Sequence, residues 1–538
     1  MTTSPFQEHP ENQEPTKKTE DQSPTPPEHF TNPLKETEHS ETLDPCILVI
    51  FGASGDLTGR KLIPAIYNLM VENQLPPNFV CVGFARREKT NESFRKELED
   101  HIKEFSRTTP DEHELSLFLD KLFYYQSEFQ SDEGYEGLNL FLKDLDSKFG
   151  TQGNRVFYLS VQPTYFSPII EQLKKHSLVY DPSSKENFSR VIIEKPFGHD
   201  YDSALNLQKD LTKSLGENQI YRIDHYLGKE TVQNLLVFRF SNSIFEGLWN
   251  NRYVDNIQIT VGESIGVEER GAFYENAGLL RDIIQNHLMQ LLTLVTMEPP
   301  TSLEPDAIRQ EKVKVLEAIQ HYKPEEIKKY ALRGQYAEGF IEGAPVKAYR
   351  QEDRVNPKSN VETFAALRLF IDNWRWSGVP IYIRAGKRLP KRSTEIVVSF
   401  KKTPNILFFK DKKEKHNVPN QVIFRIQPDE GISIRFHSKV PGSAKVITPV
   451  NMDFQYASYF GSEVPEAYER LIYDCILGDN TLFARVDESL HSWRFLTPIL
   501  QYWDKTPLTD EEFYPSGTWG TSASNSLLKS ENRQWKPV

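Results

Sequence analysis

Residues 46–59 read CILVIFGASGDLTG, and this stretch decides the expected fold. Cys46 to Phe51 form a continuous apolar run, which is typical of a strand buried on both faces of a parallel sheet. Three glycines follow within residues 52–59, and apolar residues then recur at helical spacing from Leu62 to Met70. A glycine-rich turn between a strand and a helix is where a dinucleotide pyrophosphate binds. The stretch therefore predicts the first unit of a Rossmann-like domain.

The end of the second expected strand, 79–83, indicates which dinucleotide is used. An acidic residue there would bind both ribose hydroxyls of NAD, but the chain has Arg86 and Arg87. Adjacent guanidinium groups pair with a ribose 2'-phosphate, so we expect a preference for NADP. Two alternatives stay open: the arginines as a solvated basic turn, and the glycines, which depart from G-x-G-x-x-G, as a tight turn alone.

Strand patterns continue through 155–161, 190–194 and 219–223 in alternation with helical patterns, which predicts a doubly wound parallel sheet. Ligands in such sheets lie beyond the carboxyl ends of the strands. Lys195, in the sequence EKPFG that follows the second of these runs, is therefore placed to meet both cofactor and substrate. A cis bond before Pro163 or Pro196 would shape the crevice, although an ordinary loop stop is the alternative for each proline.

Composition excludes several classes of protein. The chain has 538 residues, of which 38% are hydrophobic and 26% charged, so more than one globular domain is expected. Its net charge of -12 argues against a general nucleic-acid binder, and its apolar runs are shorter than the roughly 20 residues of a membrane span. Three distant cysteines in apolar surroundings indicate buried, reduced thiols and a cytoplasmic protein. The first 44 residues, rich in Pro, Glu and Thr, are expected to form a disordered tail.

Residues 222–230 read RIDHYLGKE and combine an acid, a base, a phenol and an ammonium around one glycine. If the backbone coils after Asp224, then His225 and Lys229 fall on one face and Asp224 points elsewhere. Two cationic groups on one side suit an anion such as phosphate, and a carboxylate on the other suits the orientation of a base.

Beyond Lys229 we expect a helix at 230–240 and a strand at 256–261 that runs into Glu263. A long helix follows, and its apolar stripe is Leu280, Ile283, Ile284, Leu288 and Leu291. His287 lies on or beside this stripe. In isolation such a histidine is more often a core residue than a catalyst, but polar neighbours, Asp282 among them, favour a functional role.

The rest of the chain has strand-like runs without regular intervening helices, at 364–370, 381–384, 395–400, 422–426 and 432–436. The expected fold class is therefore α/β plus α+β. It consists of a tail at 1–44, an NADP-binding Rossmann-like domain at 45–223, and a larger domain at 224–538 with a mostly antiparallel sheet and helices. The run of cations from Arg384 to Arg392 would bind a phosphate or a sugar if it lay over the crevice.

Five motifs together resemble the glucose-6-phosphate dehydrogenase family from about Cys46 to the C-terminus. They are GASGDL (52–57), EKPFG (194–198), RIDHYLGKE (222–230), RDIIQNH (281–287) and WRW (374–376) leading into Gly386-Lys387. The resemblance implies NADP-dependent oxidation of D-glucose 6-phosphate at C1 to 6-phospho-D-glucono-1,5-lactone, the first step of the oxidative pentose phosphate pathway. It also implies a homo-dimer or homo-tetramer. We expect no metal and, from the charge and the short apolar runs, no nucleic-acid or membrane partner.

The resemblance assigns roles residue by residue. His287 becomes the general base and Asp224 the carboxylate that orients it. The implied cofactor-binding residues are Gly52, Ser54, Gly55, Asp56, Leu57, Arg86, Pro163 and Lys195. The implied substrate-binding residues are Lys195, His225, Tyr226, Lys229, Glu263, Asp282, Lys387, Arg392 and Gln427. Many members have two prolines after the third strand where this chain has Gln162-Pro163, so the cis bond is expected at Pro163. No motif decides whether a second, structural NADP binds.

Two other functions fit part of the pattern. A sugar dehydrogenase of the glucose-fructose oxidoreductase type also uses Glu-Lys-Pro, but there the lysine is catalytic and the 222–230 motif has no purpose. A catalytically inactive NADP sensor would keep the glycine turn and the arginines but would need neither His287 nor Lys229.

Overall fold

The computed structural model describes residues 43–538, except 405–417, 444–445, 462–464 and 530. The expected tail at 1–44 therefore lies outside the described residues, apart from Leu43 and Asp44. Within the described part of the chain, no helix combines the length and the apolar character that crossing a bilayer requires.

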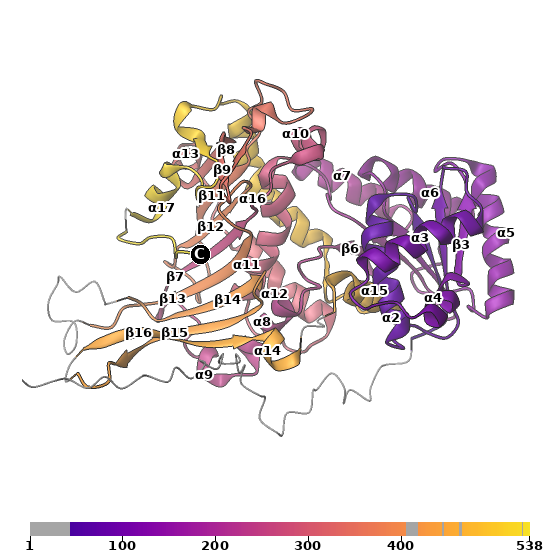
Figure 1. Ribbon diagram of the computed structural model, residues 1–538, viewed down its shortest axis with the longest axis horizontal. Coiled ribbons are helices and arrows are strands. Elements are labelled where there is room, and N and C mark those ends of the chain that lie inside the picture. Colours follow the sequence, from indigo (N-terminus) through magenta and orange to yellow (C-terminus); the bar gives the residue numbers. More distant parts are fainter. Residues whose placement is uncertain (1–42, 405–417, 444–445, 462–464, 530) are drawn as a thin grey trace, which may run out of the picture. The chain divides into compact units, whose positions relative to one another are not determined.

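The first sheet has seven strands in the order β17-β6-β5-β4-β1-β2-β3 (Figure 1). Its strands are β1 (Cys46–Phe51), β2 (Phe79–Ala85), β3 (Leu122–Gln126), β4 (Arg155–Leu159), β5 (Ser189–Ile193), β6 (Ile220–Ile223) and β17 (Phe483–Ala484). Strands β1 to β6 pair in parallel in the doubly wound order 3-2-1-4-5-6, and β17 adds antiparallel to β6. The predicted Rossmann-like sheet is confirmed.

The strand β1 owes its place in the middle of this sheet to its unbroken apolar sequence. Cys46, Leu48 and Ile50 join one core cluster, whereas the alternate residues of the strand join the cluster on the opposite face. All six side chains are at most 1% exposed. A strand that must bury both faces cannot alternate polar with apolar residues.

Helices cover both faces of this sheet. They are η1 (Thr58–Leu62), α2 (Ile63–Val71), α3 (Asn91–Phe105), α4 (Glu112–Leu119), α5 (Asp132–Phe149), η2 (Pro163–Tyr165), α6 (Phe166–Lys175), α7 (Tyr201–Thr212) and η3 (Glu217–Gln219). Side chains cap several of them: Thr90 accepts from the amide of Ser93 at the start of α3, and Ser131 accepts from that of Gly134 in α5.

The second sheet has nine strands in the order β16-β15-β14-β13-β7-β12-β11-β8-β18. They are β7 (Val254–Gly262), β8 (Ala331–Ala337), β11 (Phe364–Leu369), β12 (Ile381–Gly386), β13 (Ser393–Phe400), β14 (Gln421–Gln427), β15 (Gly431–Lys439), β16 (Ile447–Gln455) and β18 (Phe513–Pro515). All neighbours pair antiparallel except β7 with β12 and β8 with β18, so the predicted mostly antiparallel sheet is confirmed. A small hairpin, β9 (Gly339–Ile341) and β10 (Ala344–Val346), stands apart.

The remaining helices belong to the second half of the chain. They are α8 (Glu230–Phe240), α9 (Ser243–Glu246), η4 (Glu268–Arg270), α10 (Gly271–Leu279), η5 (Leu280–Leu288), α11 (Met289–Thr296), α12 (Pro305–Glu317), α13 (Pro324–Tyr330), η6 (Tyr349–Gln351), α14 (Tyr456–Phe460), α15 (Ala467–Leu477), α16 (Val486–Asp504), η7 (Asp510–Glu512), η8 (Ser522–Asn525) and α17 (Ser526–Lys529). Helices η5 and α11 pack into the large apolar core of the second sheet.

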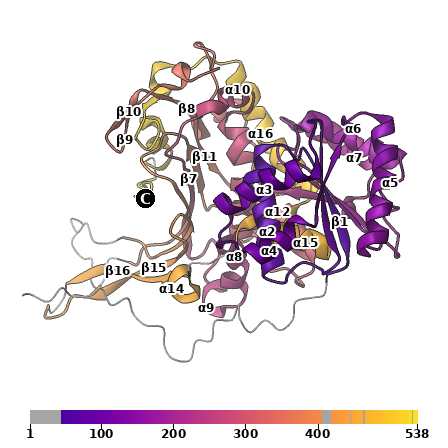
Figure 2. The same cartoon turned by 45° about the vertical axis from the view of Figure 1, so that its right-hand side comes forward.

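One C-terminal segment returns to the first sheet. Helix α15 lies beside α2 in both Figure 1 and Figure 2, and its residues Leu471, Ile472 and Cys475 belong to the same core cluster as β1. Strand β17 then extends the sheet beyond β6. The first sheet is therefore completed by residues that lie about 250 positions later in the sequence.

The expected cis proline and the expected long helix each differ from the structure in one respect. Among the described residues, the peptide bond before Pro196 is cis, which is one of the two expected places, and so is the bond before Pro428, whereas the bond before Pro163 is not. Pro163 occupies the first position of the short helix η2, where its fixed φ angle suits a helix start. The long helix expected after Gly278 is present from Leu280 to Thr296, but its first part, η5, is wound as a π-helix. Gly278, with φ +68°, separates this helix from α10.

Candidate active site

The site lies where the carboxyl ends of strands from both sheets come together. Lys195 follows β5 and Asp224 follows β6, whereas Glu263 follows β7 and Lys387 follows β12. Strands β7 and β12 are parallel neighbours with Gly262 paired to Gly386, so the next residues of the two strands are also adjacent. Carboxyl ends of parallel strands are the usual place for a ligand, and two sheets supply them here.

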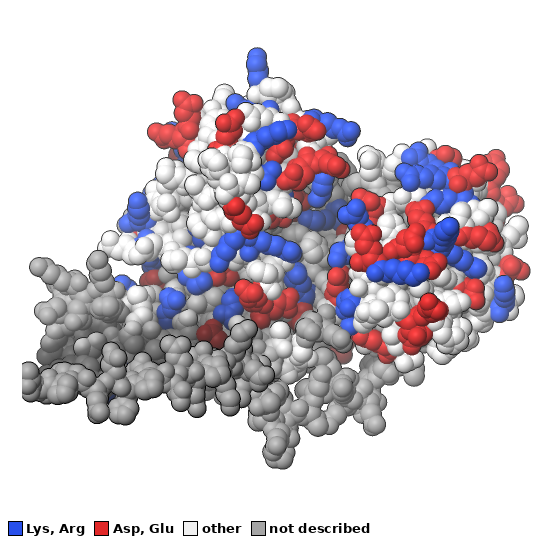
Figure 3. Space-filling model, in the orientation of Figure 1, with Lys and Arg blue, Asp and Glu red and all other residues white. Residues whose placement is uncertain are grey.

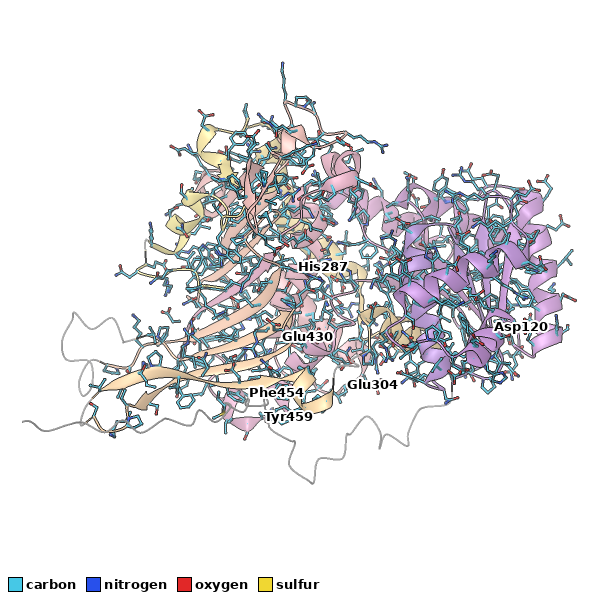
Figure 4. All side chains as sticks on the ribbon, in the orientation of Figure 1. Asp120, His287, Glu304, Glu430, Phe454 and Tyr459 are labelled. Carbon is cyan, nitrogen blue, oxygen red and sulfur yellow. The ribbon has the colours of Figure 1, made fainter. Side chains whose placement is uncertain are left out.

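His287 on η5 bridges two groups of the first sheet. Its Nδ1 lies 2.5 Å from Asp224 Oδ1, and its Nε2 lies 3.0 Å from Lys195 Nζ. Both His287 and Asp224 are buried. A carboxylate can only accept and an ammonium can only donate, so the proton of a neutral imidazole lies on Nδ1 and Nε2 accepts. The lone pair on Nε2 therefore accepts from Lys195, which is partly exposed. His287 is labelled in Figure 4.

The charges around His287 favour this neutral form. Burial lowers the pKa of His287 below 6.5, Asp224 works in the opposite direction, and Lys195 lowers it further. Burial also opposes ionisation of Asp224, but the His287 ring and its hydrogen bond outweigh this and hold the pKa of Asp224 at about 2. At neutral pH the pair is therefore a carboxylate beside an unprotonated imidazole, which is the arrangement of a general base with its orienting acid.

A second charged group adjoins the first. Lys195 Nζ donates to the backbone oxygen of Asp282 at 2.7 Å and to its Oδ1 at 3.2 Å. Asp282 Oδ2 lies 4.0 Å from Lys387 Nζ, which in turn lies 2.5 Å from Glu263 Oε2. Burial raises the pKa of Asp282, but the two ammonium groups outweigh it and keep that pKa below its ordinary value. The result is a row of acceptors and donors next to His287 that suits a polyhydroxylated ligand.

Aromatic rings hold the imidazole in place. The ring of Tyr226 stacks on His287 with 4.2 Å between centroids and 16° between planes, and His225 meets the same imidazole edge-on at 4.6 Å. Burial lowers the pKa of His225 well below 6.5 and raises that of Tyr226 to about 12. Both are therefore neutral at pH 7 in the absence of a ligand.

The segment after Asp224 is a series of turns, not a helix. Leu227 N donates to Asp224 O and Lys229 N donates to Tyr226 O, and Lys229 becomes the residue before helix α8. Its ammonium lies 5.9 Å from the Tyr226 ring. Burial lowers the pKa of Lys229, and Glu430, labelled in Figure 4, works in the opposite direction.

The second sheet meets this segment through Tyr226. Gln427 Nε2, at the end of β14, donates to Tyr226 Oη at 3.2 Å and to Thr394 Oγ1 at 3.1 Å. Arg392 Nη2 donates to Gln427 Oε1 at 3.2 Å and is exposed. Thr394 and Gln427 are register partners of β13 and β14, so the strand pairing places both beside the turn.

The glycine turn and the two arginines form a separate group at the ends of β1 and β2. Gly52 has φ +83°, and a Cβ there would lie 2.2 Å from the backbone oxygen of Ser160, so only glycine fits between β1 and β4. Arg87 Nη1 donates to Ser54 O at 3.5 Å, whereas Arg86 is exposed and lies 3.9 Å from Glu128. The glycine turn before η1 and the exposed guanidinium fit a dinucleotide with a 2'-phosphate.

Other cofactor residues expected from the sequence flank this turn. Gly55 N donates to Gly52 O, Leu57 precedes η1, and the exposed Asp56 lies 3.9 Å from Arg60. Pro163 is exposed beyond β4, the neighbour of β1. In Figure 3 acidic and basic side chains are interspersed over the face that is shown.

Several polar residues of the site were not found by sequence reasoning. Tyr158 and Tyr468 both donate to Glu194 Oε1, at 2.6 and 3.3 Å, and Tyr468 also stacks on His225 at 6.3 Å. Tyr468 comes from α15, and no local pattern there indicates that the helix returns to the first sheet. Thr394 is equally inconspicuous, because alternating strands contain many threonines.

One group of described residues has the spacing of metal ligands. Asp224, His225 and His287 each offer one ligand atom, and these atoms lie within 4.8 Å of one another. However, both nitrogens of His287 are engaged, by Asp224 and by the ammonium of Lys195. A cation at this place would have to displace that ammonium, so the donor set fits an acid-base pair better than a metal ion.

Comparisons with known proteins agree with this geometry. Residues 49–234 match the family "Glucose-6-phosphate dehydrogenase, NAD binding domain", and residues 236–536 match "Glucose-6-phosphate dehydrogenase, C-terminal domain". The glucose-6-phosphate 1-dehydrogenase of Chlamydia pneumoniae is 50% identical over 515 residues, which cover 95% of this chain and 100% of the relative.

Two solved structures are similar over the same length. One is described as glucose-6-phosphate dehydrogenase in complex with its substrate glucose-6-phosphate, with a TM-score of 0.83 and 34% identity. The other is glucose-6-phosphate 1-dehydrogenase from Mycobacterium avium, with a TM-score of 0.77 and 33% identity. Each match covers 92% of this chain and 99% of the other.

Proposed function

Because the chain belongs to the glucose-6-phosphate dehydrogenase family, we propose that the site around His287 carries out the family's reaction. The protein oxidises D-glucose 6-phosphate at C1 to 6-phospho-D-glucono-1,5-lactone and produces NADPH, the first step of the oxidative pentose phosphate pathway. The observation that carries the proposal is the Asp224–His287 pair, buried and capped by Lys195 at the point where the two sheets meet.

His287 is the general base in this proposal. Its Nε2 takes the proton of the C1 hydroxyl, and Nδ1 keeps its hydrogen bond to Asp224 throughout. Asp224 fixes the tautomer and stabilises the imidazolium that forms, because its carboxylate stays charged. The substrate hydroxyl has to replace the Lys195 ammonium at Nε2, and Asp282 already holds that ammonium from the other side.

NADP accepts the hydride that leaves C1. We assign its binding to Gly52, Ser54, Gly55, Asp56, Leu57, Arg86, Pro163 and Lys195. The tight turn at Gly52, with φ +83° between β1 and the start of η1, supports pyrophosphate binding at the helix start. The exposed Arg86 supports recognition of the 2'-phosphate.

Lys195, His225, Tyr226 and Lys229 are assigned to the sugar phosphate and the oxygens beside it. The supporting observation is electrostatic: burial lowers the pKa values of His225 and Lys229, so each gains from an incoming dianion. Glu263 and Asp282 are assigned to sugar hydroxyls, together with Lys387, Arg392 and Gln427 from the second sheet. The contacts of Lys387 with Glu263 and Asp282 support this grouping.

One absorbance assay tests the function. We expect NADPH to form with glucose 6-phosphate and far less with unphosphorylated glucose, because the phosphate contacts are lost. Equal rates with the two sugars would favour a sugar dehydrogenase in which Lys195 is catalytic. No NADPH with either sugar would favour an NADP-binding sensor.

We also propose a homo-dimer or homo-tetramer in the cytoplasm. The outermost strand β16 and its neighbour β15 expose Met452 and Phe436, and such an uncovered apolar edge supports pairing with a second subunit. The three buried free cysteines support a reducing compartment. A sedimentation experiment that finds only monomer at working concentration would contradict the oligomer.

A further inference from the structure

The start of helix η5 is held by a residue outside the catalytic cluster. Helix α10 ends at a sharp turn in which Gly278 has φ +68° and ψ 170°, and η5 begins two residues later. The first amides of any helix lack partners within the helix and need acceptors from elsewhere. Helix η5 carries Asp282 and His287, so the position of its first turn determines where both side chains lie.

Glu362, in the segment before β11, supplies these acceptors. Its backbone oxygen accepts from Leu279 N at 3.1 Å, and its Oε1 accepts from Leu280 N at 3.0 Å. The residue is 5% exposed, so water does not compete for these amides. A Cβ on Gly278 would lie 2.6 Å from the same Oε1. The Glu362 carboxylate therefore occupies the space that a side chain at position 278 would need.

The same segment also fixes Lys387. The neighbour of Glu362, Thr363, accepts from Lys387 N at 2.9 Å, and Tyr514 Oη donates to the backbone oxygens of both residues. The dipeptide 362–363 thus contacts the start of the helix that carries Asp282 and the strand end that carries Lys387. These contacts help to fix the Asp282 carboxylate and the Lys387 ammonium, which lie 4.0 Å from each other. Lys195 binds Asp282 from the opposite side.

We propose that Glu362 is a positioning residue of the active site, whose side-chain oxygen caps η5 and thereby sets the places of Asp282 and His287. The proposal rests on the roles given above to those two residues. A side-chain oxygen at this position is sufficient, because a neutral amide oxygen accepts the Leu280 amide as a carboxylate does. A negative charge adds to the effect at a helix start but is not required for it.

The test compares three variants of the full chain. Glu362→Ala removes the acceptor, and Glu362→Gln keeps it without the charge. Glu275→Ala is the matched control, because Glu275 joins the neighbouring helix α10 to Tyr349 of η6 and to Ser359, three residues before Glu362, and its hydrogen bonds go neither to η5 nor to the site. For each variant kcat, KM for glucose 6-phosphate, KM for NADP and the melting temperature are measured.

We expect kcat of Glu362→Ala to fall by about tenfold to a hundredfold, since displacements on the order of 1 Å in a reacting group have effects of this size. KM for glucose 6-phosphate should rise because Asp282 moves, whereas KM for NADP should change much less, because the residues assigned to NADP at the ends of β1 and β2 do not contact η5. Glu362→Gln should restore kcat to near the wild-type value. Glu275→Ala should lower the melting temperature and leave kcat unchanged.

Three results would overturn the inference: unchanged kcat in Glu362→Ala, a Glu362→Gln variant as slow as Glu362→Ala, or an equal loss of kcat in Glu275→Ala. If Glu362→Ala fails to fold, Glu362→Gln still decides, because an intact, folded protein with a strongly reduced kcat contradicts an acceptor role. A parallel His287→Asn measurement separates this from the proposed function. A loss of kcat there, with none in Glu362→Ala, removes only the inference about Glu362.

Discussion

At the scale of single residues, His287 gives the sharpest prediction. In the wild-type protein His287 Nδ1 lies 2.5 Å from Asp224 Oδ1. His287→Asn removes the proton acceptor Nε2 but keeps a polar side chain beside Asp224. We expect kcat to fall by about a hundredfold to ten-thousandfold, the usual effect of a lost general base. Binding of glucose 6-phosphate, measured calorimetrically, should change little. A near-normal kcat would exclude His287 as the base.

Asp224→Asn makes a prediction about pH dependence. The base works only when unprotonated, so kcat falls as the pH drops through the pKa of His287. Burial lowers this pKa and Asp224 raises it, so loss of the carboxylate should lower the pKa further. In the variant we expect the acid limb of the kcat profile to move to lower pH, while the plateau falls by about 10²- to 10⁴-fold. An acid limb that moves upward or stays in place would contradict the electrostatic coupling.

We propose that Arg86 determines the preference for NADP over NAD. Its guanidinium is exposed at the end of β2, with Glu128 as its ion-pair partner at 3.9 Å. Arg86→Ala should raise KM for NADP and leave KM for NAD and for glucose 6-phosphate nearly unchanged. Measurements of kcat/KM with NADP and with NAD give the preference between the two cofactors. An unchanged preference for NADP over NAD would transfer the role to Arg87, for which Arg87→Ala is the matched variant.

At the scale of elements, the sequence predicted the strands that bury continuous apolar runs. The bounds of β1, Cys46–Phe51, are those expected, and helix α8 spans the expected 230–240. Local pattern succeeded here because burial on both faces requires an unbroken apolar run. The local pattern did not show that 280–288 is wound as a π-helix, because the apolar stripes of a π-helix and an α-helix differ little over two turns. The capping contact of Glu362, which joins residues 82 positions apart, leaves no trace in local sequence either.

The site was predictable only in part, because contacts between residues far apart in the sequence leave no local pattern. Asp224 and His287 lie 63 positions apart, and their pairing followed from the family resemblance and not from spacing. Residues with conspicuous chemistry, such as Lys195 beside Pro196, could be found at the ends of strands. Tyr468 and Thr394 could not, because tyrosine and threonine are common where they have no role, and their positions depend on tertiary packing.

Helix α15 gives a prediction at this scale. Its buried Glu469 accepts from Asn68 at 2.9 Å and from Arg107 at 3.0 Å, and so joins the helix to α2 and to the end of α3. Removal of one partner from a buried charged pair leaves the other uncompensated. Glu469→Ala should therefore lower the free energy of unfolding by about 3 kcal/mol, at the low end of the usual range because Arg107 also pairs with Glu72.

Urea denaturation measures this change, and Glu466→Ala, at the residue that precedes the same helix, is its control. The ion pair of Glu466 with Lys61 is exposed, so its loss should cost less than about 1 kcal/mol. Equal effects of the two substitutions would mean that Glu469 has no special part in anchoring the helix.

At the scale of the whole molecule, the first sheet depends on a distant part of the chain. Leu471, Ile472, Cys475 and Ile476 of α15 and Phe483 of β17 are at most 1% exposed and lie in the core cluster of that sheet. Burial of an apolar side chain of this size contributes about 1.5–3 kcal/mol. Five of them together supply on the order of 10 kcal/mol, which is comparable to the whole stability of a typical domain.

A fragment of residues 43–234 should therefore not fold as an independent domain, although the sequence suggested a unit ending near 223. We expect it to lack near-ultraviolet circular dichroism and a cooperative urea transition, because without 465–485 the face of β6 and α2 is exposed to water. The matched control joins 465–485 to the fragment through a glycine-serine linker, which is feasible because β17 pairs antiparallel with β6.

The linked fragment should regain a cooperative transition. Cooperative unfolding of the fragment without the added segment would show instead that the N-terminal domain is self-sufficient, and that α15 and β17 only dock on a sheet already formed.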